Sequence, residues 1–459
     1  MKIAIYTLGC KVNQYETQAM ERELTGRGHT LVPFGQAADV CIINTCTVTA
    51  VSDHKSRQAI RRARKANPAA VVAVCGCYAQ TDPQAVARLE VDLVGGASQR
   101  LAFLDELERL AASRASAQTR QEDGSYCPPG AEDPSPCLVT TDNIMSTRIF
   151  EELPAGGLAS RTRAMLKVED GCVNFCSYCI IPYARGPVRS LPVQRAAEEA
   201  RRLMAEGYKE LVLTGIEISS WGRDLAKGAE QKDKEDKPEL ADLVEAICAA
   251  APECRIRLGS LEPRTITEDF CRRILSLHNL CPHFHLSLQS GCDATLKRMN
   301  RRYDTARYLE SVKLLRKYYV NPGITTDLIV GFPGETEEEF AQTLAFLEKC
   351  TFTAMHIFPY SPRPGTPAAG MPDQVSNGEK ERRAHRAAQV AETLQHAYLQ
   401  SWVGQSLPVL FEEEKDGFTR GYAPNYVEVK LPGQYSLHNI EKSVHITAAE
   451  KDFLLGELI

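Results

Sequence analysis

The chain has 459 residues, of which 43% are apolar and 25% are charged, and a net charge of −5. This length exceeds the size at which one hydrophobic core keeps growing, so we expect two or three domains. The longest apolar runs, such as Val71–Val74, are too short to span a bilayer, and the N-terminal residues lack a secretory segment. We therefore expect a cytoplasmic protein, and the acidic balance argues only weakly against a nucleic-acid partner.

The first segment alternates strand-like runs at 3–8, 40–43 and 71–75 with helical patterns that begin near Asn13 and Asp53. This order predicts an N-terminal parallel sheet covered by helices, a Rossmann- or flavodoxin-like α/β domain over 1–112. A cysteine follows each of these three strands: Cys10, Cys46 and Cys77. The carboxyl ends of parallel strands share one rim of a sheet, so these cysteines can meet in space.

Residues 113–157 are largely polar and rich in Gly, Pro and Ser, which predicts a linker with some extended structure. Over 158–397, strand-like runs alternate with helical patterns and predict a partial (βα)6 barrel with its site at the carboxyl ends of the strands. The capping-box pair Thr336 and Glu339 marks one helix start, and the charge-rich run 227–237 reads as a solvated loop. The six strand runs are 164–168, 210–214, 255–259, 283–288, 324–330 and 354–358.

Short β-like runs separated by Gly, Pro and Asn fill the last segment, 398–459. They lie at 408–411, 426–431 and 444–447 and predict a small all-β barrel. This module carries nine acidic and five basic residues. RNA binding by this module would therefore depend on a local surface rather than on net charge, or on recognition of the shape of the RNA.

Sixteen cysteines are many for a chain of this length. Disulfides are rare in a reducing compartment, so metal binding or catalysis is the leading explanation for cysteines that cluster. Cys172, Cys176 and Cys179 lie within eight residues, just after the first barrel strand. Structural zinc usually takes four ligands as two separated pairs, and cubane [4Fe–4S] clusters usually take four thiolates. Three thiols on a cubane leave one iron open to a substrate.

This cysteine spacing resembles that of the radical-SAM superfamily, in which the open iron binds S-adenosylmethionine. The resemblance implies that Tyr178 packs near the adenine and that Thr214-Gly215 forms the turn that binds the amino group. The remaining cofactor contacts that it implies are Ser260, Glu262, Gln289, Ile329 and Gly331. Gln289 and Gly331 are equally well read as ordinary loop and turn residues.

The N-terminal cysteines lie in the segments Thr7–Gln14, Ile43–Thr49 and Cys75–Gln80. Here the chain resembles the methylthiotransferase family, which adds this domain and a second [4Fe–4S] cluster to the radical-SAM barrel. The resemblance runs nearly end to end, and the small β module resembles a TRAM domain. On an extended chain Cys75 points to the same side as Cys77, so spacing alone cannot choose between them. The family's Gly-Cys pattern implies Cys77.

An unactivated aromatic C–H bond is too weakly acidic for any side chain to deprotonate, so its substitution needs a radical route. The resemblance implies two S-adenosylmethionine molecules per product, one as methyl donor and one as source of a 5′-deoxyadenosyl radical. Segments 8–17, 213–216 and 358–367 are most similar to the group that acts on N6-threonylcarbamoyladenosine 37 of transfer RNA. We therefore expect methylthiolation of that base at C2, with an electron donor such as flavodoxin or ferredoxin; the sequence does not identify the sulfur donor.

Two basic clusters offer phosphate contacts to RNA. One contains Arg57, Arg61, Arg62, Arg64 and Lys65, and the other contains Lys297, Arg298, Arg301 and Arg302. A solvated helix face with local ion pairs explains either cluster equally well.

Three alternatives stay open at this point. Sister groups of the family act on isopentenyladenosine 37 of transfer RNA or on an aspartate of a ribosomal protein. An alternative of another class is a non-catalytic RNA-binding protein with structural zinc, which would be colourless and would not need S-adenosylmethionine.

Overall fold

The computed structural model describes residues 1–122, 137–154, 156, 162–225 and 238–459, with the side chains of 117–122 left out. The chain forms two compact units. The first contains Met1–Gly156, Asp170–Val173 and Cys179–Arg189, and the second contains Gly157–Glu169, Asn174–Tyr178 and Ser190–Ile459. No helix in these described ranges is long and apolar enough to cross a membrane.

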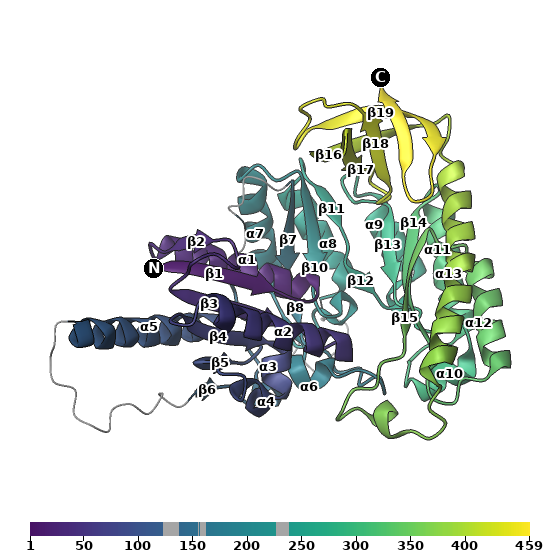
Figure 1. The fold of residues 1–459 in the computed structure, drawn as a ribbon. Helices are drawn as coiled ribbons and strands as arrows, with labels where there is room; N and C mark the ends of the chain where they lie inside the picture. The colour runs from purple at the N-terminus through teal and green to yellow at the C-terminus, as the bar shows by residue number, and fades with distance from the viewer. Residues whose placement is uncertain (123–136, 155, 157–161, 226–237) are drawn as a thin grey trace, which may run out of the picture. The chain divides into compact units, whose positions relative to one another are not determined.

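The first unit is built on a six-stranded parallel sheet in the order β2-β1-β3-β4-β5-β6 (Figure 1). Its strands are Lys2–Thr7 (β1), Thr30–Val32 (β2), Val40–Thr45 (β3), Val71–Gly76 (β4), Leu93–Gly95 (β5) and Leu138–Thr140 (β6). The three strands predicted from sequence, β1, β3 and β4, lie side by side in the centre of this sheet. The predicted N-terminal parallel-sheet domain is confirmed.

Helices cover both faces of this sheet because its strands alternate their side chains between two apolar layers. The helices are Lys11–Gly26 (α1), Ala50–Ala66 (α2), Cys77–Thr81 (α3), Pro83–Ala87 (α4), Arg100–Glu122 (α5) and Ile181–Arg185 (α6). Ile3 and Ile42 pack with residues of α1 and α5, whereas Ala4 and Ile43 pack with residues of α2, α3 and α4. A short 3₁₀ helix spans Ile144–Ser146 (η1).

Parts of the expected linker 113–157 are regular structure. Helix α5 continues to Glu122, and β6 adds the sixth strand to the sheet. The register pairs Leu93 of β5 with Leu138 of β6, so these residues belong to the N-terminal sheet. The predicted loop at 227–237 lies outside the described residues. The predicted domain boundaries remain predictions.

The second unit contains a partial βα barrel, and seven of its strands, all in the described residues, form two parallel sheets. The first sheet has the order β11-β10-β7, with β7 at Arg163–Lys167, β10 at Glu210–Thr214 and β11 at Arg255–Arg257. The second has the order β12-β13-β14-β15, at Ser260–Leu261, His283–Leu286, Gly323–Val330 and Ala354–Pro359. The strand expected at 255–259 ends at Arg257 as β11, and the short strand β12, which was not predicted, follows it in the second sheet.

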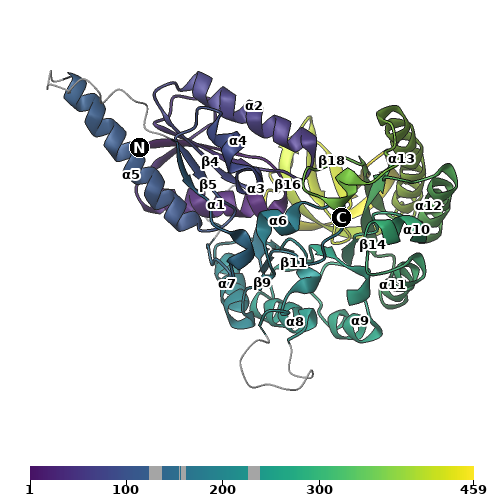
Figure 2. The same cartoon turned by 90° about the horizontal axis from the view of Figure 1, so that it is seen from below.

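The barrel helices lie in an arc outside the strands (Figure 2). They are Val193–Ala205 (α7), Leu240–Ala250 (α8), Glu268–Leu275 (α9), Asp293–Arg298 (α10), Thr305–Tyr318 (α11), Glu337–Cys350 (α12) and Asn377–Gln400 (α13). The capping box predicted at Thr336 and Glu339 is present at the start of α12. The described residues also contain short elements: strands Glu169–Asp170 (β8) and Arg189–Ser190 (β9), and 3₁₀ helices Ile218–Ser220 (η2), Pro263–Thr265 (η4) and Pro367–Gly370 (η5).

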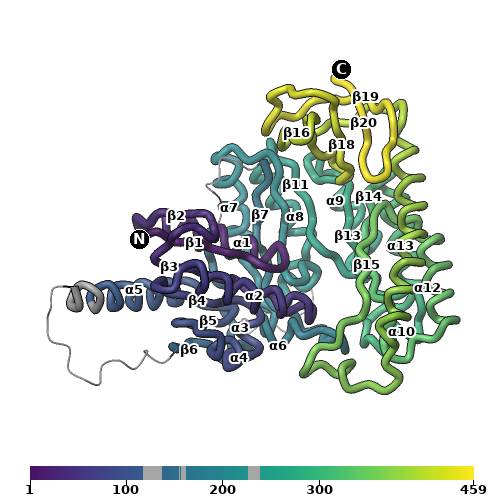
Figure 3. The backbone as a smooth tube through the Cα atoms, viewed as in Figure 1, coloured from purple at the N-terminus to yellow at the C-terminus, as the bar shows by residue number. Residues whose placement is uncertain are grey.

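Helix α13 leads into a closed five-stranded barrel in the order β16-β17-β18-β20-β19 (Figure 3). Its strands are Ser406–Lys415 (β16), Phe418–Tyr422 (β17), Glu428–Pro432 (β18), Glu441–Ala449 (β19) and Leu454–Leu458 (β20). Side chains such as Val409, Phe411 and Val444 fill its interior. The predicted small all-β barrel is confirmed.

Candidate functional site

The structure places Cys10, Cys46 and Cys77 at one rim of the N-terminal sheet. Each follows the carboxyl end of β1, β3 or β4, which are neighbours in the strand order. The order reverses at β1, which lies between β2 and β3. Ligands of open α/β sheets bind at such a switch point. Cys10 is exposed, whereas Cys46 and Cys77 are buried.

Two buried asparagines join the loops that carry these cysteines. Asn13 Nδ2 donates to the carbonyl oxygens of Leu8 and Thr45, both at 2.8 Å. Asn44 Nδ2 donates to the carbonyl oxygen of Asn13 at 3.0 Å. These bonds fix the loop after β1 against the end of β3, so Cys10 and Cys46 are held on neighbouring segments.

The glycines of the two Gly-Cys pairs allow this close approach. Gly9 has φ +109°, and a Cβ there would lie 2.8 Å from Cys46 Cβ. Gly76 has φ +97°, and a Cβ there would lie 2.5 Å from the carbonyl oxygen of Thr45. An L side chain at either position would be strained and would also push the loop after β3 away.

The two candidate cysteines after β4 occupy different surroundings. Cys75 is fully buried in the apolar layer that contains Ile3 and Leu104, and burial raises its pKa to about 11. Cys77 begins α3, and burial raises its pKa to about 12 although Arg185 acts in the opposite direction. A metal ion deprotonates a thiol that coordinates it, so a raised pKa does not exclude Cys77 as a ligand.

A buried arginine contacts the sulfur of Cys77. Arg185 Nε donates to Cys77 Sγ at 3.2 Å, and Arg185 Nη2 donates to Asn13 Oδ1 at 2.5 Å. Its Nη1 and Nη2 also bond to the carboxylate of Glu16, which accepts a further bond from Arg100 Nη2 at 2.7 Å. Arg185, Arg100 and Glu16 are each at most 1% exposed. Sequence reasoning missed this network because its members are far apart along the chain.

Backbone hydrogen bonds hold the second cysteine motif, which consists of Cys172, Cys176 and Cys179. The Cys172 N–H donates to the carbonyl oxygen of Gly186 at 3.0 Å. The Ser177 N–H donates to the carbonyl oxygen of Met299, also at 3.0 Å. Cys176 is buried, and its Sγ accepts a hydrogen bond from Arg301 Nη1 at 3.1 Å.

The described residues contain no three His, Cys, Asp or Glu side chains already arranged to hold a metal ion. The donor chemistry nevertheless suits iron, because both candidate sets consist of thiols and iron–sulfur clusters are held by thiolates. The three N-terminal thiols lie at the ends of adjacent strands, and the other three lie within eight residues of sequence.

Three predicted cofactor residues lie together in the second unit. Tyr178 and Ile329 pack against an apolar cluster that contains Met299, Phe332 and Tyr360. Gln289 adopts φ +69°, and its carbonyl oxygen accepts a hydrogen bond from the Ile329 N–H at 2.9 Å. The left-handed backbone of Gln289 indicates a constrained loop end beside this apolar cluster.

The nearby Gly331 N–H donates to Glu335 Oε2 at 2.6 Å. Glu335 also accepts a bond from Arg383 Nη1 at 2.8 Å. Arg383 of α13 therefore holds the turn after β14 in place through Glu335.

Gly215 and Glu262 belong to a second group, which contains two acidic residues that sequence reasoning missed. The Glu217 N–H donates to Glu169 Oε2 at 2.8 Å, and a Cβ at Gly215 would lie 2.7 Å from that oxygen. Burial, with a contribution from Glu262, raises the pKa of Glu217. Ser260 lies exposed on β12. These residues all follow or end barrel strands, which is the one sequence signal that marks them.

Most of the predicted RNA-contact arginines have protein partners. Arg298 Nη2 pairs with Glu339 Oε2 at 2.5 Å, and Arg301 points inward to Cys176. Arg64 Nη2 pairs with Asp92 at 2.7 Å, and Arg57 donates to the hydroxyl of Tyr78 at 3.3 Å. Arg61 is exposed. The inward direction of Arg301 argues against phosphate contact by that residue.

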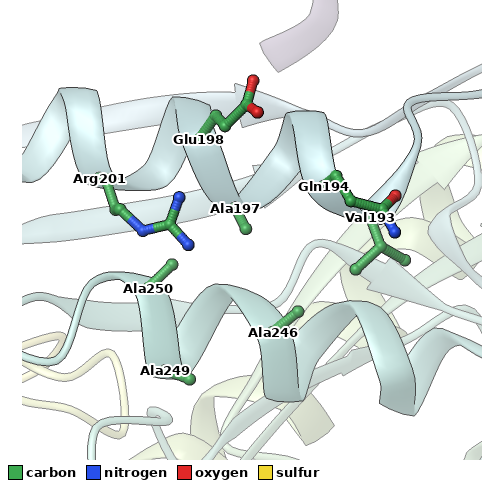
Figure 4. Close-up of a pocket in the computed structure, with 8 residues that line it drawn as sticks. All are labelled: Val193, Gln194, Ala197, Glu198, Arg201, Ala246, Ala249 and Ala250. Carbon is green, nitrogen blue, oxygen red and sulfur yellow. The ribbon is translucent and has the colours of Figure 1, made fainter.

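A groove between α7 and α8 lies on the helical outside of the barrel (Figure 4). Half of its lining residues are alanines, and Arg201 points toward α8 while Glu198 points away (Figure 4). None of the predicted site residues lines it, and a groove of small side chains offers few specific contacts. We therefore do not assign the reaction to it. Its residues are Val193, Gln194, Ala197, Glu198, Arg201, Ala246, Ala249 and Ala250.

Comparison with protein families gives two matches. Residues 166–347 match the Radical SAM superfamily, and residues 2–96 match Uncharacterized protein family UPF0004. The chain is 38% identical to the threonylcarbamoyladenosine tRNA methylthiotransferase MtaB of Bacillus subtilis, over 100% of this chain and 96% of that protein. It is 34% identical to the MtaB of Thermotoga maritima, over 94% and 91%.

Another relative is the tRNA-2-methylthio-N(6)-dimethylallyladenosine synthase of Pelotomaculum thermopropionicum. It is 31% identical over 100% of this chain and 97% of that protein. Among solved structures, the radical S-adenosylmethionine methyltransferase TsrM of Kitasatospora setae is similar in fold. It has a TM-score of 0.53 and 16% identity, and the match covers 80% of this chain and 77% of TsrM.

Proposed function

This chain belongs to the radical-SAM methylthiotransferase family, an enzyme family that uses S-adenosylmethionine and [4Fe–4S] clusters, and we propose that it methylthiolates N6-threonylcarbamoyladenosine 37 of transfer RNA at C2. The observation that carries the proposal is the gathering of Cys10, Cys46 and Cys77 at one sheet rim, in a chain that also has the three-cysteine barrel motif.

Each cysteine set would hold one cluster. Cys172, Cys176 and Cys179 hold the cluster that receives S-adenosylmethionine, and Cys10, Cys46 and Cys77 hold the auxiliary cluster. When bound, these clusters supply one-electron reduction of S-adenosylmethionine and a binding site for the transferred sulfur. The physiological reductant would be a one-electron donor such as flavodoxin or ferredoxin.

The two residue groups at the strand ends suit different parts of S-adenosylmethionine. The apolar group with Tyr178 and Ile329 suits the flat adenine ring, since ligand pockets use aromatic and aliphatic walls. The acidic group around Gly215 and Glu262, which includes Glu169 and Glu217, suits the ammonium, since carboxyl oxygens accept hydrogen bonds from its N–H groups. Ser260, Gln289 and Gly331 complete the proposed contacts.

Two kinds of observation support the threonylcarbamoyl substrate. Segments 8–17, 213–216 and 358–367 are most similar to the group that acts on this base. The relatives with the higher identities are also named for threonylcarbamoyladenosine, whereas the relatives named for dimethylallyladenosine are less similar. The dimethylallyl base and the ribosomal protein are therefore outcomes for the test to distinguish.

The test is deletion of the gene in its host, followed by digestion of total tRNA and mass spectrometry of the nucleosides. We expect the methylthio form of threonylcarbamoyladenosine to disappear and its unthiolated precursor to accumulate. The native gene restores the product, and a copy with Cys172→Ala does not.

If the methylthio form of dimethylallyladenosine is lost instead, the substrate assignment is wrong and the assignment of the reaction is retained. An unchanged nucleoside profile, in a host without a redundant enzyme, would overturn the tRNA substrate. The ribosomal protein would then be examined by peptide mass spectrometry.

A further inference from the structure

The contact between Arg185 and Cys77 is unusual among the charged contacts of the first unit because its acceptor is a sulfur atom. Arg185 ends α6, which begins two residues after Cys179, and its side chain is 0% exposed. Its Nε lies 3.2 Å from Cys77 Sγ.

We propose that Arg185 is a positioning residue that raises the reduction potential of the auxiliary cluster by donating a hydrogen bond to the sulfur of Cys77. This inference rests on the proposed function, because it requires a cluster at Cys10, Cys46 and Cys77. A hydrogen bond to a cysteine sulfur withdraws electron density and favours the reduced cluster. The positive charge of the guanidinium acts in the same direction, because reduction adds an electron.

The guanidinium is fixed in this orientation by its other two nitrogens. Nη2 donates to Asn13 Oδ1 at 2.5 Å and to Glu16 Oε2 at 3.1 Å, and Nη1 also bonds to Glu16. Asn13 in turn holds the loops that carry Cys10 and Cys46. The planar guanidinium of Arg185 therefore links the sulfur of Cys77 to Asn13 and Glu16. Lysine carries a single ammonium group, so it cannot make all of these bonds.

Charge neutralisation alone does not explain the contact with sulfur. Glu16 accepts from Arg185 and also from Arg100, whose Nη2 lies 2.7 Å from Glu16 Oε2. Arg100 Nη1 donates to the carbonyl oxygen of Gly96 at 2.6 Å. Arg100 thus belongs to the same buried network, and among the described residues its guanidinium donates to Glu16 and Gly96 rather than to a cysteine. It is the matched control for Arg185.

The experiment uses the full chain with Cys172→Ala, Cys176→Ala and Cys179→Ala, so that only the auxiliary cluster contributes to the spectrum. The protein is reconstituted with iron and sulfide under anaerobic conditions. Iron content is then measured, and the reduction potential is obtained by titration followed by electron paramagnetic resonance. Arg185→Lys and Arg100→Lys are compared with the same background.

We expect Arg185→Lys to keep its iron and to shift the potential to a more negative value. At a fixed potential near the midpoint, the ratio of reduced to oxidised cluster should fall about tenfold, which corresponds to about 59 mV for a one-electron couple. Arg100→Lys should leave the potential near that of the background, because it perturbs Glu16 without removing the bond to sulfur.

The possible failures separate from one another. If the chain with the three barrel cysteines replaced binds no iron, the proposed auxiliary cluster is overturned, and with it the basis of this inference. A cluster whose potential is equal in Arg185→Lys and Arg100→Lys would overturn the role of Arg185 alone. If Arg185→Lys loses the cluster, Arg185→Gln is titrated, because its amide still offers an N–H donor. If both variants lose the cluster and Arg100→Lys keeps it, Arg185 is needed for the cluster to bind, and its proposed effect on the reduction potential is overturned.

Discussion

Individual cysteines could be found from the sequence, but the arginines beside them could not. Thiol spacing and the position of each cysteine after a strand are local signals. The partners of Arg185, by contrast, lie at Asn13, Glu16 and Cys77, far along the chain. A basic run likewise suggested that Arg301 faces RNA, yet its guanidinium donates to Cys176. Charge density along a sequence does not determine whether an arginine points outward or into a site.

The buried pair of Arg257 and Glu210 permits a prediction on stability. Arg257 Nε lies 2.7 Å from Glu210 Oε1, and both side chains are 1% exposed. Removing one partner leaves an uncompensated buried charge, so Arg257→Met should lower the free energy of unfolding by about 3–5 kcal/mol near neutral pH. Urea unfolding followed by circular dichroism measures this. The double variant with Glu210→Leu should recover most of the loss, and a fully stable single variant would contradict the argument.

The same pair gives a pH dependence. Burial acts to raise the pKa of Glu210, but Arg257, together with Arg163 and Arg255, outweighs burial and holds this pKa below its ordinary value. A lowered folded-state pKa stabilises the fold above the pKa of the unfolded state, and this contribution is lost as pH falls through the folded-state value. The contribution of Glu210 to the stability of the native chain should therefore be lost below about pH 4, near the ordinary glutamate pKa, and urea unfolding at a series of pH values measures this loss.

At the scale of secondary structure, the sequence predicted the long apolar strands and missed the short ones. β1, β3 and β4 have continuous apolar runs, and five of the six predicted barrel ranges match observed strands closely. β2, β5 and β6 have three residues each, too few for a period to appear. β17 and β20 were missed because each contains a glycine, which is depleted in strands.

The start of α12 gives a test at this scale. The Thr336 hydroxyl accepts a hydrogen bond from the Glu339 N–H at 3.2 Å, and the Glu339 side chain accepts one from the Thr336 N–H, also at 3.2 Å. Thr336→Ala should destabilise this helix start by about 1 kcal/mol, because one capping acceptor is lost. Hydrogen exchange of the amides of residues 337–340 should become faster. Thr336→Ser keeps the acceptor and should exchange like the native chain; equal exchange in all three proteins would refute the capping role.

For the whole molecule, the order of strands and helices predicted all three architectures: a parallel sheet, a partial barrel and a small closed barrel. Such orders restrict topology because parallel strands need crossover helices, whereas short antiparallel strands do not. The break between β11 and β12, and the reach of α5 to Glu122, depend on packing and were not predicted. In the candidate site, the gathering of the three N-terminal cysteines could be predicted from the strand order. The position of Glu169 and Glu217 beside Gly215 could be seen only in the structure.

Iron content tests the assignment of one cysteine set to each cluster. With two [4Fe–4S] clusters, the reconstituted native chain should hold about eight iron atoms, and Cys77→Ala or Cys172→Ala about four each. Cys75→Ala is the matched control, because Cys75 lies two residues from Cys77 but packs in the apolar layer of the sheet. It should keep about eight iron atoms at some cost in stability, since truncating a buried thiol removes packing. Iron loss from Cys75→Ala with retention in Cys77→Ala would instead make Cys75 the ligand, and Arg185 would then contact a thiol outside the cluster.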